Sequence, residues 1–316
     1  MGITKNIQTD ENIRKMASAA FPYKTVESAT ELTEGLCNVA YLVVFTDGSK
    51  SVLKIASAGG CGLLKNEVGL MKAETYALSL VEDCKSFKAP KVQFYDNSRT
   101  LCTGDYFFME CLEGENYLKI SDKCTEEEKE QVNRDVGKAV REIIQIKGDK
   151  FGQLGDMDNA CDCLYDLIRR LISNNLSDAV AKNVEIGVPA EDILAKLERD
   201  RGFFDEIKEP VLVHYDLWEG NFFTMDRKLT GLIDWERAMW GEPLMEDRFR
   251  RHSWNKSFLE GYGQTEFNDK EMRRIRWYDI VLYLQMMTEG AYREYEDDGQ
   301  YNWIKPLFDA SYSELI

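Results

Sequence analysis

The stretch from Val211 to Glu236, VLVHYDLWEGNFFTMDRKLTGLIDWE, constrains the fold more than any other part of the chain. Short β-rich runs alternate in it with polar, turn-prone segments, which predicts a turn-rich hairpin. In such a hairpin Asp216 and Asn221 stand at opposite ends of one loop, and Asp234 stands where the next strand stops. We therefore expect three oxygen-bearing side chains at one site.

Phosphoryl transfer from a nucleotide explains why these residue types would gather. Magnesium takes oxygen ligands, which an Asn carbonyl and an Asp carboxylate supply while phosphates and water complete its shell. A second carboxylate, away from the metal, must accept or aim the proton of the attacking hydroxyl. In H-x-D-x-x-x-x-N followed by I-D, we expect Asp216 to be the catalytic base and Asn221 and Asp234 to bind magnesium. His214 is expected to orient the catalytic loop.

The segments HYD at 214–216 and IDWE at 233–236, with Asn221 between them, resemble the signature of the aminoglycoside phosphotransferase and choline kinase family. The resemblance runs from about Thr33 to about Asp247. In the trailing GEPLMED stretch, Asp247 resembles the family aspartate that braces the catalytic loop. Because these motifs occur together and follow an upstream Lys, an ordinary polar turn that contains the same residue types by chance is the poorer interpretation.

The resemblance implies an α+β, bilobal protein-kinase-like fold. An N-terminal antiparallel sheet lobe with one main helix (1–112) would be followed by a larger, mostly helical lobe (113–316). The residues agree with this division, because strand-like runs and an Asp-Gly turn mark the first part and helical periodicity marks the second. At 316 residues the chain is long enough for two lobes with their own cores.

One lysine in the first part stands in an otherwise apolar strand. Lys54 lies in V-L-K-I, where burial is costly unless a negative group meets the ammonium. In kinase-like enzymes that group is the nucleotide phosphates together with a Glu from the next helix. The predicted helix from Leu63 to Glu82 offers Glu67 and Glu74, seven residues apart on one face. The resemblance favours Glu74 as the partner, and Glu67 stays open.

Two further segments are expected to contact the nucleotide. The chain has neither G-x-G-x-x-G nor a P-loop, but the turn at 35–38 falls where the resembled fold covers the phosphates, and Asn38 takes the place of the family's residue there. The apolar run at 106–112 predicts a buried strand that leads into a hinge. The resemblance places adenine against the backbone of about Glu110 to Leu112.

The acidic balance of the chain bears on its partners. A net charge of −16 disfavours nucleic acid and anionic membranes, because phosphate surfaces attract basic patches. It leaves room for a cationic small molecule, and Glu289, Glu294 and 296–298 lie among Tyr and Trp side chains that suit a polycation. A solvated helix end is the alternative for this run. Without a long apolar run, a leader or zinc-spaced cysteines, a cytoplasmic protein with reduced thiols is expected.

A protein substrate is the poorer interpretation. Protein kinases carry a long segment after the metal aspartate, whereas here Asp234 is followed almost at once by Gly241-Glu242-Pro243. The sequence therefore predicts a magnesium-dependent enzyme that moves the γ-phosphate of ATP to a hydroxyl of a small molecule. Aminoglycoside-like acceptors come first by resemblance, with choline, amino alcohols, sugars and macrolides as alternatives. GTP stays open as the phosphate donor.

Two other classes of protein are alternatives. One is a non-catalytic, kinase-like module that binds a nucleotide, although every polar position of the motif is filled. The other is a metal-dependent hydrolase that uses His214, Asp216 and Asp234. Such a hydrolase would need neither a lone lysine in an apolar strand nor a hinge.

Overall fold

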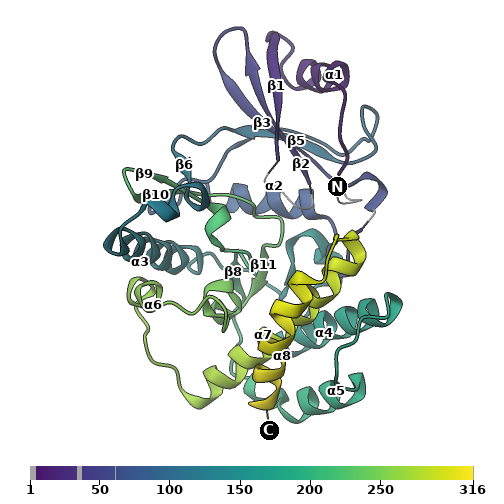
Figure 1. Ribbon diagram of the computed structural model, residues 1–316, viewed down its shortest axis with the longest axis vertical. Coiled ribbons are helices and arrows are strands. Elements are labelled where there is room, and N and C mark those ends of the chain that lie inside the picture. The colour runs from purple at the N-terminus through teal and green to yellow at the C-terminus, as the bar shows by residue number, and fades with distance from the viewer. Residues whose placement is uncertain (1–4, 34–37, 61, 316) are drawn as a thin grey trace.

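A five-stranded antiparallel sheet forms the upper body of the molecule (Figure 1). The computed structural model describes residues 5–33, 38–60 and 62–315. The strands, in the order in which they pair, are β1 (Val26–Leu32), β2 (Val39–Phe45), β3 (Lys50–Ile55), β5 (Tyr106–Glu110) and β4 (Val92–Asp96). The predicted Asp-Gly turn joins β2 to β3, and Gly48 takes the left-handed φ of +81° that this turn requires.

The sheet separates two hydrophobic cores. Helix α1 (Asp10–Ala20) begins at Thr9, whose hydroxyl accepts from the Asn12 N–H, and it packs on the outer face of the sheet to make a small core. Helix α2 (Leu70–Leu80) packs on the inner face. Its buried residues, such as Met71, share one core with Phe107 of β5 and with the helical body below. The position of α2 is therefore set by both bodies.

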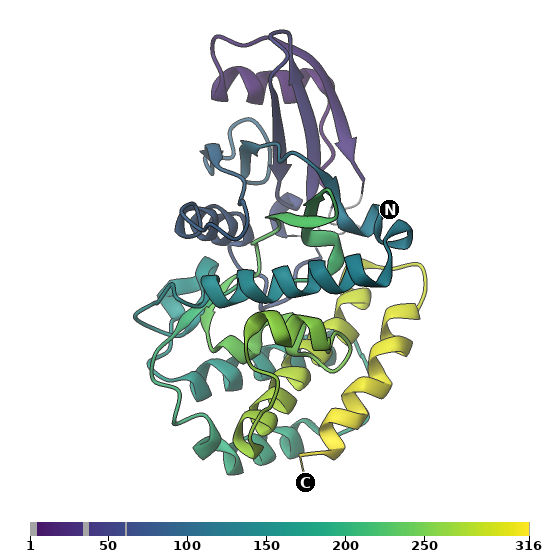
Figure 2. The same ribbon diagram turned by 90° about the vertical axis from the view of Figure 1, so that its left-hand side faces the viewer.

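The lower body is mostly helical (Figure 2). Its helices are α3 (Glu126–Ile143), α4 (Leu164–Ala181), α5 (Ala190–Arg199), α6 (Lys256–Tyr262), α7 (Asp269–Arg293) and α8 (Gly299–Ser313). Its short strands form two small sheets. One sheet pairs β10 (Lys228–Leu232), β9 (Phe222–Met225) and β6 (Glu115–Asn116) in that order. The other pairs β7 (Gly152–Gln153), β11 (Met239–Gly241) and β8 (Val211–Val213). An antiparallel sheet followed by a helical body confirms the predicted α+β class.

Two predicted helices begin later than the sequence suggested. The helix expected from Leu63 starts only at Leu70, because Gly69 is left-handed, with a φ of +60°, and lies against Gly155. A Cβ atom on Gly69 would come within 2.6 Å of the Gly155 carbonyl oxygen, so this crossing needs glycine. The helix expected from Glu246 to Tyr262 is also shorter. It starts at Lys256, because its first half forms turns and 3₁₀ segments with inward side chains.

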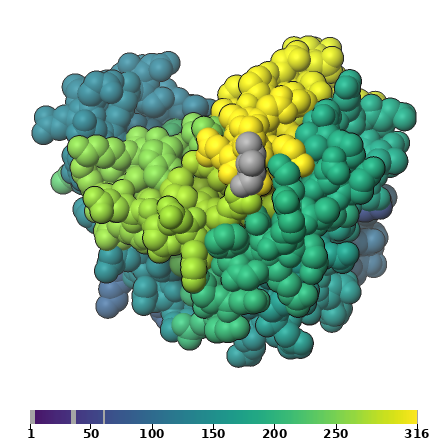
Figure 3. All heavy atoms as spheres, turned by 90° about the horizontal axis from the view of Figure 1, so that it is seen from below, coloured from purple at the N-terminus to yellow at the C-terminus, as the bar shows by residue number. Residues whose placement is uncertain are grey.

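Helix α8 completes the helical body beside the longer α7. Figure 3 shows this body from below, where the yellow C-terminal residues lie between the yellow-green and teal parts of the chain. Within residues 5–33, 38–60 and 62–315, none of the helices is both long and apolar enough to cross a bilayer.

Candidate active site

The loop between β8 and β9 carries the predicted base and one predicted magnesium ligand. Asn221 is buried, and its amide nitrogen donates to the Asp216 carbonyl oxygen at 2.7 Å, with the Asp216 carboxylate at 3.5 Å. The backbone carbonyl oxygen of Asn221 accepts from the Ile233 N–H at 3.1 Å, which joins the loop to the residue before Asp234. The structure therefore brings Asp216, Asn221 and Asp234 together, as the motif predicts.

The backbone on both sides of the site is strained. Tyr215 has a φ of +71° and Asp234 a φ of +66°, conformations that non-glycine residues seldom adopt. Such strain persists only where the surroundings hold it, and it gathers at functional sites. The residues next to Asp216 and at the end of β10 are thus fixed by their contacts rather than by local preference.

His214 lies beneath the loop and is fully buried. Its Nε2 is 2.9 Å from the Ile233 carbonyl oxygen, and its Nδ1 is 3.3 Å from the Asp216 N–H nitrogen. A neutral ring with its proton on Nε2 satisfies both contacts, because Nε2 then donates and Nδ1 accepts. Burial lowers the pKa of His214 to about 4, so the ring is neutral near pH 7. This geometry suits the predicted orienting role.

The carboxylate that braces the catalytic loop is that of Glu246. Its Oε2 accepts from the backbone N–H groups of His214, at 3.0 Å, and Tyr215, at 3.3 Å. Asp247 makes neither contact, and its Oδ1 lies 3.3 Å from Nε2 of His252. The assignment of this role to Asp247 was wrong by one residue, because the carboxylate one position earlier faces the strained turn.

Lys54 is buried at the centre of three carboxylates. Its Nζ lies 2.6 Å from Glu74 of α2, 2.5 Å from Asp234 and 2.9 Å from Glu236. Burial alone would lower the pKa of Lys54, but Asp234, Glu236 and Glu74 outweigh it and hold this pKa well above its usual value. The structure therefore pairs Lys54 with Glu74. Glu67, the alternative partner, binds two arginines elsewhere.

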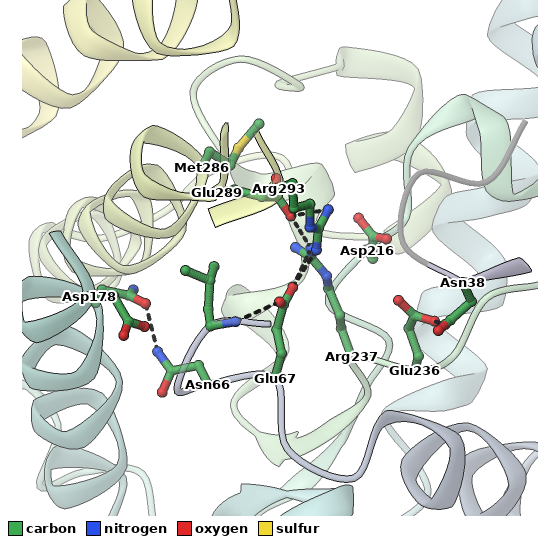
Figure 4. Close-up of polar contacts among 12 residues, drawn as sticks. Asn38, Asn66, Glu67, Asp178, Asp216, Glu236, Arg237, Met286, Glu289 and Arg293 are labelled. Carbon is green, nitrogen blue, oxygen red and sulfur yellow. Dashed lines mark hydrogen bonds and ion pairs between the residues drawn. The ribbon is translucent and has the colours of Figure 1, made fainter. Parts of the chain in front are cut away.

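Glu236 is a member of the cluster whose role the sequence did not indicate. Its carboxylate accepts from the side-chain amide of Asn38, which Figure 4 shows pointing toward it. The remainder of the predicted phosphate turn, residues 35–37, lies outside the described residues. Asp234 and Glu236 lie in a segment without strand structure, and Asp234 is left-handed, so no strand pattern in IDWE could show that both face Lys54. Asn38 directly precedes β2, so its contact with Glu236 joins the sheet to the cluster.

The cluster suits a divalent cation. Single carboxylate oxygens of Glu74, Asp234 and Glu236 lie within 4.8 Å of one another, a spacing that allows one ion to contact all three. Asp234 has a lowered pKa although burial opposes ionisation, because the charge of the Lys54 ammonium and its hydrogen bond favour the carboxylate. An ionised carboxylate and an Asn amide oxygen are both ligands of the kind that magnesium takes. The residues present therefore fit magnesium.

Asp216 is partly exposed. Burial of its carboxyl group raises the pKa to about 8, an effect that Arg237 opposes and Asp234 strengthens. A carboxylate with such a pKa accepts a proton more readily than an ordinary aspartate near neutral pH. Asp216 is therefore suited to take the proton of an attacking hydroxyl.

The predicted hinge follows β5. The Glu110 backbone N–H already donates to the Lys91 carbonyl oxygen at 2.9 Å, so it is engaged within the sheet. A backbone donor to adenine in this segment would then have to come from Cys111 or Leu112. The side chain of Glu110 is exposed.

The acidic run after α7 divides into two environments. Glu294, Asp297 and Asp298 line a cavity of about 470 Å³ between the ends of α4 and α7 and the start of α8, with Tyr295 and Tyr301. Glu289 is instead buried in ion pairs, and the exposed Trp303 lies beside His252. The structure thus gathers part of the predicted polycation site around one cavity.

The chain is similar to known proteins over most of its length. The model of the phosphotransferase enzyme family matches residues 28–278. A thermostable mutant of aminoglycoside phosphotransferase APH(4)-Ia, in ternary complex with ADP and hygromycin B, is similar at 19% identity and a TM-score of 0.66, covering 95% of this chain and 97% of that chain. A putative fructosamine-3-kinase from Thermobifida fusca is similar at 14% identity and a TM-score of 0.69, covering 95% and 98%.

A GDP and kanamycin complex of APH(2")-IIia is similar at 16% identity and a TM-score of 0.64, covering 95% of this chain and 98% of that chain. Among curated proteins no sequence matches. At these identities the solved structures establish the fold, and they confirm the predicted protein-kinase-like architecture.

Proposed function

Because the chain belongs to the phosphotransferase enzyme family and is a small-molecule kinase, we propose that it moves the γ-phosphate of ATP to a hydroxyl of an aminoglycoside-like acceptor, with magnesium. One observation supports this above the others. Lys54 from the sheet meets Glu74 and Asp234 at its ammonium, while Asn221 joins Asp216 to the same segment. Groups for phosphate, metal and acceptor hydroxyl thus lie in one constellation.

The nucleotide would lie between the sheet and the helical body. Lys54 would neutralise its phosphates, Asn38 would contact them from the position just before β2, and the backbone at 110–112 would hold adenine. Asn221 and Asp234 would hold magnesium, which when bound neutralises charge on the β- and γ-phosphates and fixes their orientation. We take 1–112 and 113–316 as the two lobes that close on it. A GDP complex among similar structures keeps GTP open as the donor.

Asp216 would act on the acceptor side. Its carboxylate accepts the proton of the acceptor hydroxyl, whose oxygen forms the new bond to the γ-phosphorus while the bond to the β–γ bridging oxygen breaks. The products are the phosphate ester and the nucleoside diphosphate. His214 and Glu246 keep the loop in place for this step, because they hold the backbone of 214–216 from below.

A cationic acceptor is supported by charge and by likeness. The chain has a net charge of −16, and acidic and aromatic side chains line the cavity at the end of α7 and the start of α8. Similar structures include complexes with hygromycin B and kanamycin, and one is a putative fructosamine-3-kinase. We therefore rank amine-bearing sugars first, with choline, other amino alcohols, neutral sugars and macrolides behind. Free thiols such as Cys84 and Cys102 fit a reducing cytoplasm.

Release of ADP from ATP and magnesium tests this function. The purified protein is offered aminoglycosides, a fructosamine, choline, small sugars and a macrolide, with Asp216→Ala as the matched control. ADP release that one acceptor class stimulates and the variant lacks is the expected result. Equal release without an acceptor would favour a hydrolase. Nucleotide binding with no turnover on any acceptor would favour the non-catalytic module.

A further inference from the structure

The segment before α2 is held by the helical body rather than by the sheet that precedes it. The Lys65 N–H donates to Asp178 of α4 at 2.8 Å. The Asn66 side chain donates to Asn175 of the same helix at 2.7 Å and to the Leu171 carbonyl oxygen at 2.9 Å. Within the segment, the Leu64 N–H also donates to Oε2 of Glu67 at 3.0 Å. Three of these four contacts involve α4 and do not depend on Glu67, so they hold the segment that leads into α2 and Glu74 when the Glu67 charge is removed.

Glu67 adds a buried charge to this segment. Its Oε1 meets Arg237 at 3.1 Å and Arg293 of α7 at 2.6 Å. Glu289 of α7 meets the same two arginines at 2.7 and 2.6 Å. Two carboxylates and two guanidinium groups thus form a closed, charge-balanced quartet (Figure 4). We call these four residues the charge quartet.

Arg237 links the charge quartet to the phosphotransfer site. It directly follows Glu236, whose carboxylate contacts Lys54, and it lies three positions after Asp234. Figure 4 shows its guanidinium among Glu67, Glu289 and Arg293, with Asp216 and Glu236 on its other side. Its positive charge also acts on Asp216 and Glu236. Arg237 therefore interacts with two sets of carboxylates, and its ion pairs within the charge quartet fix the position of its guanidinium group.

We propose that Glu67 is a positioning residue that holds Arg237 away from the catalytic carboxylates and keeps the 234–236 segment in the geometry that binds magnesium and nucleotide. This role rests on the proposed function. Without the Glu67 charge, Glu289 alone faces two buried guanidinium groups. An uncompensated buried charge is strongly destabilising, so a conformation in which Arg237 contacts another carboxylate becomes favourable. The other carboxylates whose charges act on Arg237 are Asp216 and Glu236. An Arg237 that turns to them competes with Lys54 and with magnesium for the same oxygens.

The charge quartet also adjoins the acidic cavity. Gln300 of α8 donates to Oε2 of Glu289 at 3.0 Å and to the Met286 carbonyl oxygen at 2.7 Å. Gln300 and Met286 both line the cavity. Glu289 thus has one oxygen toward the arginines and one toward the cavity wall, which locates the quartet between the nucleotide site and the cavity.

Binding of Mg-AMP-PNP, measured by isothermal titration calorimetry, tests this role without turnover. Glu67→Gln keeps the shape of the side chain and removes its charge, and we expect it to weaken binding by about 5- to 30-fold. The matched control is Glu242→Gln, because Glu242 is equally buried and pairs with Arg274 of α7 at 2.9 Å, away from the site. This control should lower the thermal midpoint while nucleotide affinity stays within about 2-fold.

A second variant separates charge balance from folding. In Glu67→Gln/Arg293→Gln one charge of each sign is removed, so Glu289 again serves Arg237 alone, and most of the nucleotide affinity should return. No recovery in the double variant, or equal weakening by Glu67→Gln and Glu242→Gln, would overturn the positioning role and leave the proposed function standing. Wild-type protein that binds no Mg-AMP-PNP would overturn the proposed function, and the positioning role with it.

Discussion

Replacing Glu246 by Gln tests how the catalytic loop is held. The Glu246 carboxylate is almost completely buried and accepts from three backbone N–H groups, those of His214, Tyr215 and Asp247. Burial raises its pKa from 4.5 to about 7, because desolvation outweighs these hydrogen bonds. The folded protein therefore keeps the proton on Glu246 at a pH where the unfolded chain has lost it.

The sign and size of the pH effect follow from this shift. Between about pH 4.5 and pH 7 the folded state binds the proton more tightly, so the free energy of unfolding falls as pH rises through this window. At about 1.4 kcal/mol per pKa unit, ionising Glu246 costs the folded protein about 3 kcal/mol in full. Glu246→Gln cannot ionise. It leaves one N–H without its acceptor, a loss of about 1–3 kcal/mol that does not depend on pH.

Urea unfolding of wild type and Glu246→Gln at about pH 4.5 and pH 8 measures this difference. Other carboxylates titrate in both proteins, so their contributions cancel in the difference between the two free energies of unfolding. Relative to the variant, the wild type should lose about 3 kcal/mol between the two pH values. A difference that stays constant with pH would refute the raised pKa. If the free energy of unfolding of the wild type instead rises relative to that of the variant as pH rises, the hydrogen bonds from the three N–H groups lower the pKa of Glu246 by more than burial raises it.

The remaining predictions concern the site and α2. Asp216→Asn should lower kcat by about 10²- to 10⁴-fold and leave Mg-AMP-PNP affinity nearly intact; a matching loss of affinity would contradict its acceptor-side role. Because the pKa of Asp216 is raised by burial to about 8 and a base works only unprotonated, kcat/KM for the acceptor should rise with pH up to about 8, and a flat profile would count against it. Asp234→Ala should weaken nucleotide binding only when magnesium is present, as calorimetry with and without the metal would reveal. Gly69→Ala should lower the free energy of unfolding by more than about 1 kcal/mol, because its Cβ would lie 2.6 Å from the Gly155 oxygen; an unchanged urea midpoint would contradict this.

Local spacing was enough to predict the catalytic loop. Asp216 and Asn221 are five residues apart in one loop, and Asp234 follows the two short strands β9 and β10 that come next, so the chain itself brings them together. The same holds for Lys54 in its strand and for the Asp-Gly hairpin. Such features depend on nearby residues, which a sequence pattern records directly.

Contacts between segments that are distant in the chain could not be predicted from the sequence. Glu67 and Glu74 were placed on one helix, but Gly69 ends the helical pattern between them because Gly155, 86 residues later, packs against it. The charge quartet joins Glu67 to α7 in the same way. The brace of the loop was misplaced by one position, since two adjacent acidic residues differ only in the direction that the backbone gives them.

Formation of the phosphate ester is the most direct measurement of the central claim. Wild-type protein with ATP, magnesium and an amine-bearing sugar is followed by ³¹P NMR, alongside Asp216→Asn as the matched variant. The proposed mechanism predicts a new phosphomonoester resonance that grows in step with ADP in the wild type and is absent in the variant. Inorganic phosphate in place of the ester, or an ester formed equally by both proteins, would contradict transfer to an acceptor hydroxyl by Asp216.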